Sequence, residues 1–89
     1  MNDVNTMDLG LINWLKDGEY RLKTLRLLRD KNFLSSELAS ALNINRASMS
    51  RILRNLKEKE LVKTVSSNSR TITYMLTSKG TEVLNEIKT

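Results

Sequence analysis

The chain of 89 residues contains no cysteine and no histidine, and these absences exclude whole classes of site. Disulfide frameworks, thiolate nucleophiles, imidazole bases and ordinary zinc or haem sites all need one of the two residues. We therefore expect no cofactor and no bound metal. Catalysis would depend on carboxylates alone, and Asp17 and Glu19 flank a turn with no partner motif, so we expect a protein that is not an enzyme.

Long apolar runs are also missing. No segment approaches the roughly 18 apolar residues that a membrane-spanning helix needs. The first four residues, MNDV, lack the basic and apolar regions of a signal peptide. We therefore expect a cytoplasmic protein with no membrane partner, and the absence of cysteine agrees with a reducing compartment.

The chain has no proline, and only 39% of it is hydrophobic. Its length predicts one small domain with a single core. Because neither disulfides nor metals add stability, the aliphatic core must be well packed, and association with a second copy is plausible.

Positive charge is in excess and is unevenly placed. Lysine and arginine number 15 against 10 acids, and the pI of about 9.8 is typical of proteins that bind polyanions. Residues 1–30 carry five bases and five acids, whereas residues 31–60 carry six bases and three acids. Residues 45–57 hold four bases and no acid. This basic run is either a solvated helix face or a polyanion-binding surface.

Two helices are predicted in the first third of the chain. Residues 8–16 are broadly apolar and are followed by Asp17-Gly18, a pair typical of helix ends. From residue 19 to about residue 31, leucines recur at helical spacing and indicate an amphipathic helix. Its buried stripe is expected to hold Leu22, Leu25 and Leu28.

A short helix is predicted over residues 35–42. Because so short a helix does not form alone in water, it must pack against the rest of the chain. Ser35 or Ser36 is expected to cap its first amides. Its inward face is expected to hold Leu38, Ala41 and Leu42.

Two asparagines separate this helix from the next one, which runs from residue 46 to about residue 59. Asn43 suits the left-handed residue that ends a helix, and Asn45 suits the cap of the following helix. Helical spacing then predicts two faces. The inward face comprises Met49, Ile52, Leu53 and Leu56, and the opposite face comprises Arg46, Ala47, Ser50, Arg51 and Arg54.

Beyond residue 60 the hydrophobic period changes from that of a helix to that of a strand. Residues 61–66 and 71–76 are rich in β-formers and flank a polar tip, which predicts a β-hairpin. Alternation places Ile72, Tyr74 and Leu76 on one half-buried side.

A last helix is predicted after the hairpin, capped by Thr77 or Ser78. Gly80 lies in its first turn, where the missing side chain permits close packing. Its inward stripe is expected to hold Val83, Leu84 and Ile87. The fold class is therefore mainly α with a small β-hairpin.

Three phrases of the sequence carry a resemblance to a known family. SSELASALNINRASMSRILRNLKEKELV, followed by TYMLTSKG and preceded by WLKDGEYRLKTLRLL, resembles the winged helix-turn-helix of MarR-type and ArsR-type transcriptional regulators, with small archaeal members the most similar. The resemblance covers residues 14–80. It implies a three-helix core plus a wing and a C-terminal helix, within one domain of residues 1–89.

The resemblance also implies how that domain is divided. Residues 8–17 form an N-terminal helical extension, 35–59 the helix-turn-helix, 61–76 the wing and 77–88 the C-terminal helix. Asn43 and Glu60 stand where the family often has glycine. Asparagine is an easy substitute, but glutamate suits a left-handed residue less well, so the helix before it is expected to end differently or one residue later.

The function implied by the resemblance is that of a sequence-specific regulator, more often a repressor, that binds double-stranded DNA with residues 45–59 in the major groove. Arg46 and Arg51 are the expected base readers, because arginine can bridge guanine O6 and N7. Arg54 and Lys57 are expected to meet phosphates. The residues at or near the base edges are Asn45, Arg46, Ala47, Ser48, Ser50 and Arg51.

Further contacts are expected outside that helix. Ser35 and Ser36 can meet a phosphate as well as cap a helix. In the wing, residues 66–70 form either a solvated turn or a contact with the DNA backbone or minor groove, through Asn68 and Arg70. Lys63 is a weaker phosphate candidate.

Trp14 and its leucine neighbours have two interpretations. They cover the domain's own core, or they form a homodimer interface with Val83, Leu84 and Ile87 of the last helix. A dimer would set two recognition helices roughly 34 Å apart and would favour a near-palindromic operator. We expect a homodimer.

An alternative function is a winged-helix module for protein–protein or RNA interaction without operator binding, since the fold hosts such roles. The acid-free basic face favours DNA. The chain has only four aromatic residues, too few for base stacking along a single strand. No residue pattern identifies a small-molecule effector.

Overall fold

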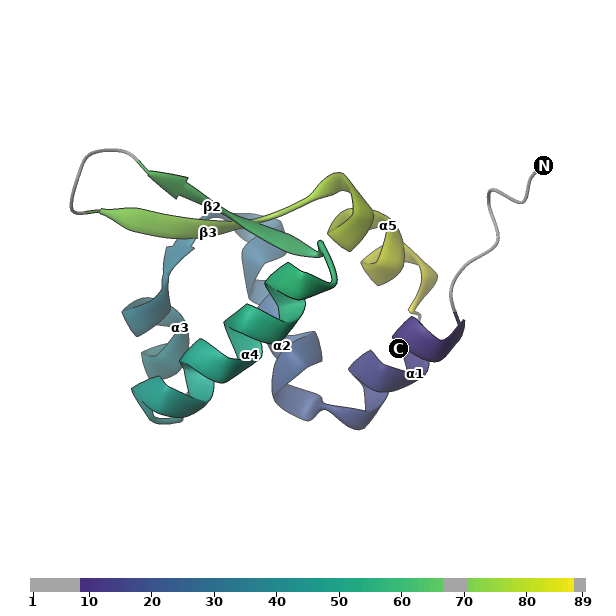
Figure 1. The fold of residues 1–89 in the computed structure, drawn as a ribbon, viewed down its shortest axis with the longest axis horizontal. Helices are drawn as coiled ribbons and strands as arrows, with labels where there is room; N and C mark the ends of the chain where they lie inside the picture. The colour runs from purple at the N-terminus through teal and green to yellow at the C-terminus, as the bar shows by residue number, and fades with distance from the viewer. Residues whose placement is uncertain (1–8, 67–70, 88–89) are drawn as a thin grey trace.

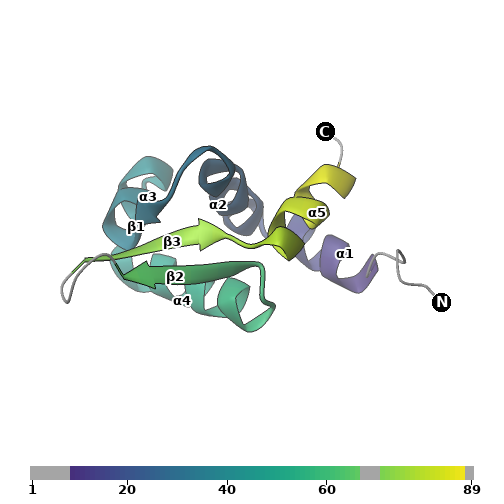
Figure 2. The same ribbon diagram turned by 90° about the horizontal axis from the view of Figure 1, so that it is seen from above.

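The computed structural model describes residues 9–66 and 71–87. Figures 1 and 2 show α1 and α5 together at one end of the molecule and α3 at the other; beside α4, β2 runs toward the α3 end and β3 returns toward α5. The elements in chain order are α1 (Leu9–Asp17), α2 (Glu19–Asp30), β1 (Phe33–Leu34), α3 (Ser35–Leu42), α4 (Arg46–Glu58), β2 (Val62–Ser66), β3 (Ile72–Leu76) and α5 (Ser78–Glu86).

Helix α1 ends at Asp17 and α2 begins at Glu19, so the predicted break at Gly18 is confirmed. A Cβ on Gly18 would lie 2.5 Å from the Cδ of Arg21, so a side chain at this position would displace the Arg21 side chain. Arg21 links α2 to α1 at this junction. Its Nη1 donates a hydrogen bond to the Trp14 carbonyl at 2.7 Å, and its guanidinium lies 4.2 Å from the centre of the Trp14 ring.

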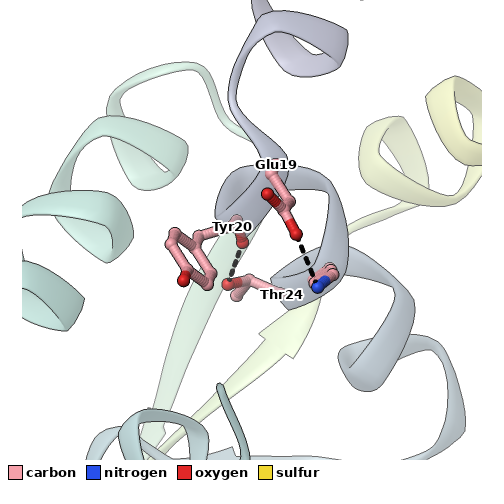
Figure 3. Close-up of polar contacts among 4 residues, drawn as sticks. Glu19, Tyr20 and Thr24 are labelled. Atoms are coloured by element: carbon pink, nitrogen blue, oxygen red, sulfur yellow. Dashed lines mark hydrogen bonds and ion pairs between the residues drawn. The ribbon is translucent and has the colours of Figure 1, made fainter. Parts of the chain in front are cut away.

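Helix α2 has a buried and a solvated side. Leu25, Leu28 and the Thr24 side chain are buried, and the Thr24 hydroxyl donates to the Tyr20 carbonyl at 2.6 Å (Figure 3). On the exposed side, Lys23 pairs with Glu19 at 2.7 Å, one helical turn away. That hydrogen bond, and secondarily the charge of Lys23, lower the pKa of Glu19.

Helix α3 differs from its prediction in two ways. No serine caps it; Leu34 is the N-cap residue, and its N–H donates to Glu37 Oε1 at 2.8 Å. The chain enters the helix directly from β1, so Ser35 is already a helical residue. Ala41, predicted to be buried, is exposed, and Ala39 is buried in its place. At about 100° per residue, Ala39 completes the inward face of this helix and Ala41 falls at its edge.

The turn between α3 and α4 is as predicted. Asn43 has a φ of 57° and a ψ of 47°, the left-handed conformation, and its N–H donates to the carbonyls of the preceding turn. Asn45 Oδ1 accepts a hydrogen bond from the Ser48 N–H at 2.8 Å and so caps α4. The two asparagines therefore fix where α4 starts and in which direction it runs.

Helix α4 packs through the predicted apolar face, with Met49, Leu53 and Leu56 buried. It ends at Glu58, so the alternative that the helix runs one residue longer is wrong. Glu60 itself adopts the left-handed conformation, with a φ of 63°. The Glu60 and Leu61 N–H groups then donate to the Lys57 and Leu56 carbonyls at 2.9 and 3.0 Å, which closes the helix end.

The hairpin belongs to a three-stranded antiparallel sheet of order β1-β3-β2. Strand β1 was not predicted, because two residues are too few to show alternation; it pairs Phe33 with Tyr74 and Leu34 with Thr73. In the hairpin, Val62 pairs with Leu76 and Ser66 with Ile72. Ile72, predicted to be half-buried, is 49% exposed; it begins β3, one residue before the pairing of β3 with β1 starts.

Helix α5 is capped by Thr77, whose hydroxyl accepts the Gly80 N–H at 3.0 Å. Val83, Leu84 and Ile87 are buried, and they form one core with leucines of α1, α2, α3 and α4. Leu11 and Leu15 of α1 belong to this core, so the first interpretation of the N-terminal leucines holds for them. Within residues 9–66 and 71–87, no helix is long and apolar enough to cross a bilayer.

Candidate nucleic-acid interface

The basic face of α4, defined here as Arg46, Ala47, Ser50, Arg51 and Arg54, is exposed. At about 100° per residue these positions occupy a sector of roughly 140° on the side away from the core. The ion pairs Lys23–Glu19 and Lys79–Glu60 do not involve these three arginines, and none of the three is paired with an acid among residues 9–66 and 71–87. The guanidinium groups are therefore available to an external anion.

The first residues of α4 differ in what they can still donate. Asn45 Oδ1 is occupied by the cap, which leaves its side-chain NH₂ free of that bond. Ser48 is half-buried and its N–H is used by the same cap, whereas Ser50 is exposed. The exposed arginines and Ser50 are thus the groups of α4 best placed to reach a ligand.

The remaining predicted residues spread around α4. Lys57 lies in its last turn, and Lys63 lies on β2; both are exposed. Ser35 and Ser36 are half-buried at the start of α3. Asn68 and Arg70, the predicted wing contacts, lie outside the described residues.

An open hollow of about 430 Å³ lies where the starts of α3, α4 and β3 meet. It brings together predicted residues from two helices and three residues that sequence reasoning did not assign to the site, Leu34, Ile72 and Tyr74. Their place depends on the pairing of β3 with β1, which no local sequence pattern indicates. The lining comprises Leu34, Ser35, Ser36, Arg46, Ser50, Ile72 and Tyr74.

The site offers cations, hydroxyls and the apolar side chains of Leu34 and Ile72, but no metal-binding chemistry. Within the two described stretches, no group of acids could hold a metal ion. An arrangement of unpaired arginines beside serines, on the exposed face of a helix whose other face is buried in the core, suits an extended polyanion better than a small substrate.

The solved structures similar to this chain include regulators with the same fold. A DNA complex of Lactococcus lactis ZitR matches with a TM-score of 0.69 and 28% identity over 75% of this chain and 47% of that one. An apo C30AH42A mutant of ZitR matches with a TM-score of 0.72 and 27% identity over 88% and 62% of the two chains. This chain thus spans about half the length of the DNA-bound protein.

A further match shows the fold alone. The adhesin competence repressor AdcR of Streptococcus pyogenes has a TM-score of 0.71 and 19% identity over 88% of this chain and 63% of that one. No curated protein sequence matches the chain.

These structures confirm the expected winged helix-turn-helix fold and its likeness to MarR-type regulators. The family model described as the HVO_A0261 N-terminal domain matches residues 11–89. The chain belongs to the HVO_A0261 N-terminal domain family, and its fold is the winged helix-turn-helix.

Proposed function

We propose that the chain is a sequence-specific regulator of transcription, a repressor, that binds double-stranded DNA with α4 in the major groove. The observation that carries the proposal is the basic face of α4: three exposed arginines with no acid from the described residues against them. An α-helix fits the major groove of B-form DNA, and the N-terminal residues of such a helix reach the base edges. The likeness to ZitR, solved in complex with DNA, supports the same assignment.

Within this proposal the arginines have different tasks. Arg46 and Arg51 lie in the first half of α4 and read bases, because their forked guanidinium groups match the two acceptors of guanine. Arg54 and Lys57 lie farther along the helix and bind phosphates, which sets affinity without reading sequence. The wing, residues 66–70, meets the backbone or the minor groove.

We also propose a homodimer built around α1. Val83, Leu84 and Ile87, named above as dimer candidates, are buried in the chain's own core, so they are not available without rearrangement. Leu9 remains 71% exposed on α1, at the end of the molecule opposite α3. Light scattering at micromolar concentration is expected to give about twice the chain mass of 10.2 kDa; a mass equal to that of one chain contradicts the dimer.

Selection of bound duplexes from a random library tests the DNA assignment. We expect one enriched motif, with two-fold symmetry if the protein dimerises. A variant with Arg46, Arg51 and Arg54 all changed to alanine is expected to enrich nothing. The matched control removes three exposed positive charges elsewhere, at Lys16, Arg29 and Lys31, and is expected to select the wild-type motif. Failure of the wild-type protein to enrich any sequence contradicts the proposal.

A further inference from the structure

The large exposed hydrophobic residues of the described chain are Leu9, Tyr20 and Ile72, at 71%, 41% and 49% exposure. Leu9 and Tyr20 lie on α1 and α2, whereas Ile72 begins β3 and lines the hollow that also holds Arg46 and Ser50. Ile72 is thus an uncovered apolar side chain inside the candidate DNA-binding surface. Neither the resemblance to MarR-type and ArsR-type regulators nor the charge pattern of the sequence assigns a role to Ile72.

Ile72 is held in position from both sides. Across the hairpin it pairs with Ser66, and the next residue, Thr73, pairs with Leu34 of β1. Leu34 in turn caps α3, where its N–H donates to Glu37 Oε1. Ile72 therefore lies at a fixed register on β3, paired with β2 directly and followed by residues that also pair with β1.

The chemistry around Ile72 matches the alternation of a nucleic-acid backbone. A DNA strand presents anionic phosphates separated by deoxyribose rings, whose C–H faces are apolar. Three residues that line the hollow supply matching groups: Arg46 has a guanidinium, Ser50 a hydroxyl and Ile72 a branched aliphatic chain. A phosphate satisfies the first two groups, and a sugar covers the third.

We propose that this hollow seats one nucleotide unit of the duplex backbone, with its phosphate against Arg46 and Ser50 and its deoxyribose packed on Ile72. The inference rests on the proposed function. It moves Arg46 and Ser50 from the base edges to the DNA backbone, leaves Arg51 as the base reader, and adds an apolar contact. Burial against a sugar removes the aliphatic surface of Ile72 from water, which contributes affinity without releasing counterions. This contact and the arginine contacts therefore differ in their salt dependence.

Two variants of nearly equal shape separate the apolar contact from a structural effect. Ile72→Val and Ile72→Thr are both β-branched and both suit a strand, but only valine keeps the surface apolar. On a duplex carrying the selected motif, we expect Ile72→Val to bind within about twofold of wild type and Ile72→Thr to bind about threefold to tenfold more weakly. The slope of log affinity against log salt is expected to be unchanged in both.

Two further variants calibrate the measurement. Arg46→Ala is expected to make the salt slope shallower by about 0.9, since one phosphate contact is lost. Tyr20→Ala removes an exposed hydrophobic residue of α2 that does not line the hollow, and its affinity for DNA is expected to be that of wild type. Equal affinities for Ile72→Val and Ile72→Thr overturn the apolar contact even where wild-type binding and the Arg46→Ala effect are as expected.

A direct readout uses the wild-type protein. In the DNA complex, the δ1 methyl of Ile72 is expected to show intermolecular nuclear Overhauser effects to deoxyribose protons. A complex without these effects overturns the proposed packing of a deoxyribose on Ile72. Failure of the wild-type protein to bind any duplex overturns the proposed function and the seat together. Tighter binding to single-stranded RNA of the same sequence also overturns both the proposed function and the proposed nucleotide contact. If only the contact with Ile72 is wrong, the protein still binds the duplex more tightly than the RNA.

Discussion

The hydroxyl of Thr77 donates a hydrogen bond to the main-chain carbonyl of Glu60 at 2.7 Å. The same hydroxyl accepts the Gly80 N–H at 3.0 Å, and the Thr77 N–H donates to the Leu61 carbonyl at 3.0 Å. One residue therefore joins the end of α4, the residue before β2 and the first turn of α5. Because β2 and β3 are the strands of the wing, this junction sets the wing against α4.

Replacing the Thr77 hydroxyl tests the junction. Thr77→Val keeps the shape but loses both side-chain hydrogen bonds, and we expect it to lower the free energy of unfolding by about 1–2 kcal/mol. Thr77→Ser keeps the hydroxyl and is the control, with a smaller loss. Urea unfolding monitored by circular dichroism measures both. Equal stability of the valine and serine variants would show that the hydroxyl contributes little.

Glu60 is a glutamate in a left-handed conformation, with a φ of 63°. For residues with a Cβ this conformation costs roughly 1–2 kcal/mol, whereas glycine adopts it freely. We expect Glu60→Gly to raise the free energy of unfolding by about 1 kcal/mol, even though it removes the exposed ion pair with Lys79 at 4.0 Å. Glu60→Ala removes the same ion pair without relieving the backbone. If the alanine variant gains as much as the glycine variant, backbone strain is not the cause.

Gly80 packs against the backbone at the same junction. A Cβ on this residue would lie 2.4 Å from the Leu61 carbonyl oxygen and 2.7 Å from Leu76 Cδ1. We expect Gly80→Ala to lower the free energy of unfolding by about 1–3 kcal/mol because strand and helix must move apart. Gly10→Ala, the same change at an exposed position of α1, is expected to raise it by up to about 1 kcal/mol. A stabilised Gly80→Ala variant contradicts the close approach.

The pair of Glu19 and Lys23 predicts a pH effect. The pKa of Glu19 is lowered, first by its hydrogen bond to Lys23 and then by the lysine charge. The stability from this pair is therefore present above the ordinary glutamate pKa and is lost as pH falls through the lowered value. In Lys23→Met, an NMR titration is expected to show the pKa of Glu19 moved upward. An unchanged pKa contradicts the ion pair in Figure 3.

The features predicted correctly from the sequence are those that one or two neighbouring residues determine. Asn43 and Asn45 are typical of a helix end and a helix cap, and both take these roles. The apolar stripe of α4 is likewise a local pattern, and its burial leaves the arginines outside. Because these local patterns follow one another in a fixed order along the chain, the winged helix-turn-helix could be predicted from the sequence.

What could not be predicted depends on residues distant in sequence. The β1–β3 pairing joins Leu34 to Thr73, so neither the third strand nor the exposure of Ile72 is visible in a local pattern. Glu60 adopts a conformation that its residue type disfavours, because residues on both sides are tied to Thr77 and to α4. The cap of α3 falls on Leu34 because β1 leads directly into the helix.

The different tasks proposed for Arg51 and Arg54 provide the central test. On the selected duplex and its single-base variants, Arg54→Ala is expected to weaken all sequences similarly and to make the salt slope shallower by about 0.9. Arg51→Ala is expected to cost roughly 1–3 kcal/mol and to relax the preference at one base pair.

The most direct measurement is therefore the affinity of Arg51→Ala for each single-base variant of the selected duplex, compared with wild type by fluorescence anisotropy at fixed salt. The account predicts weaker binding and a lost preference at one position, with the other positions still discriminated. If Arg51→Ala keeps both the wild-type affinity and the wild-type preference at every position, α4 does not read DNA through Arg51.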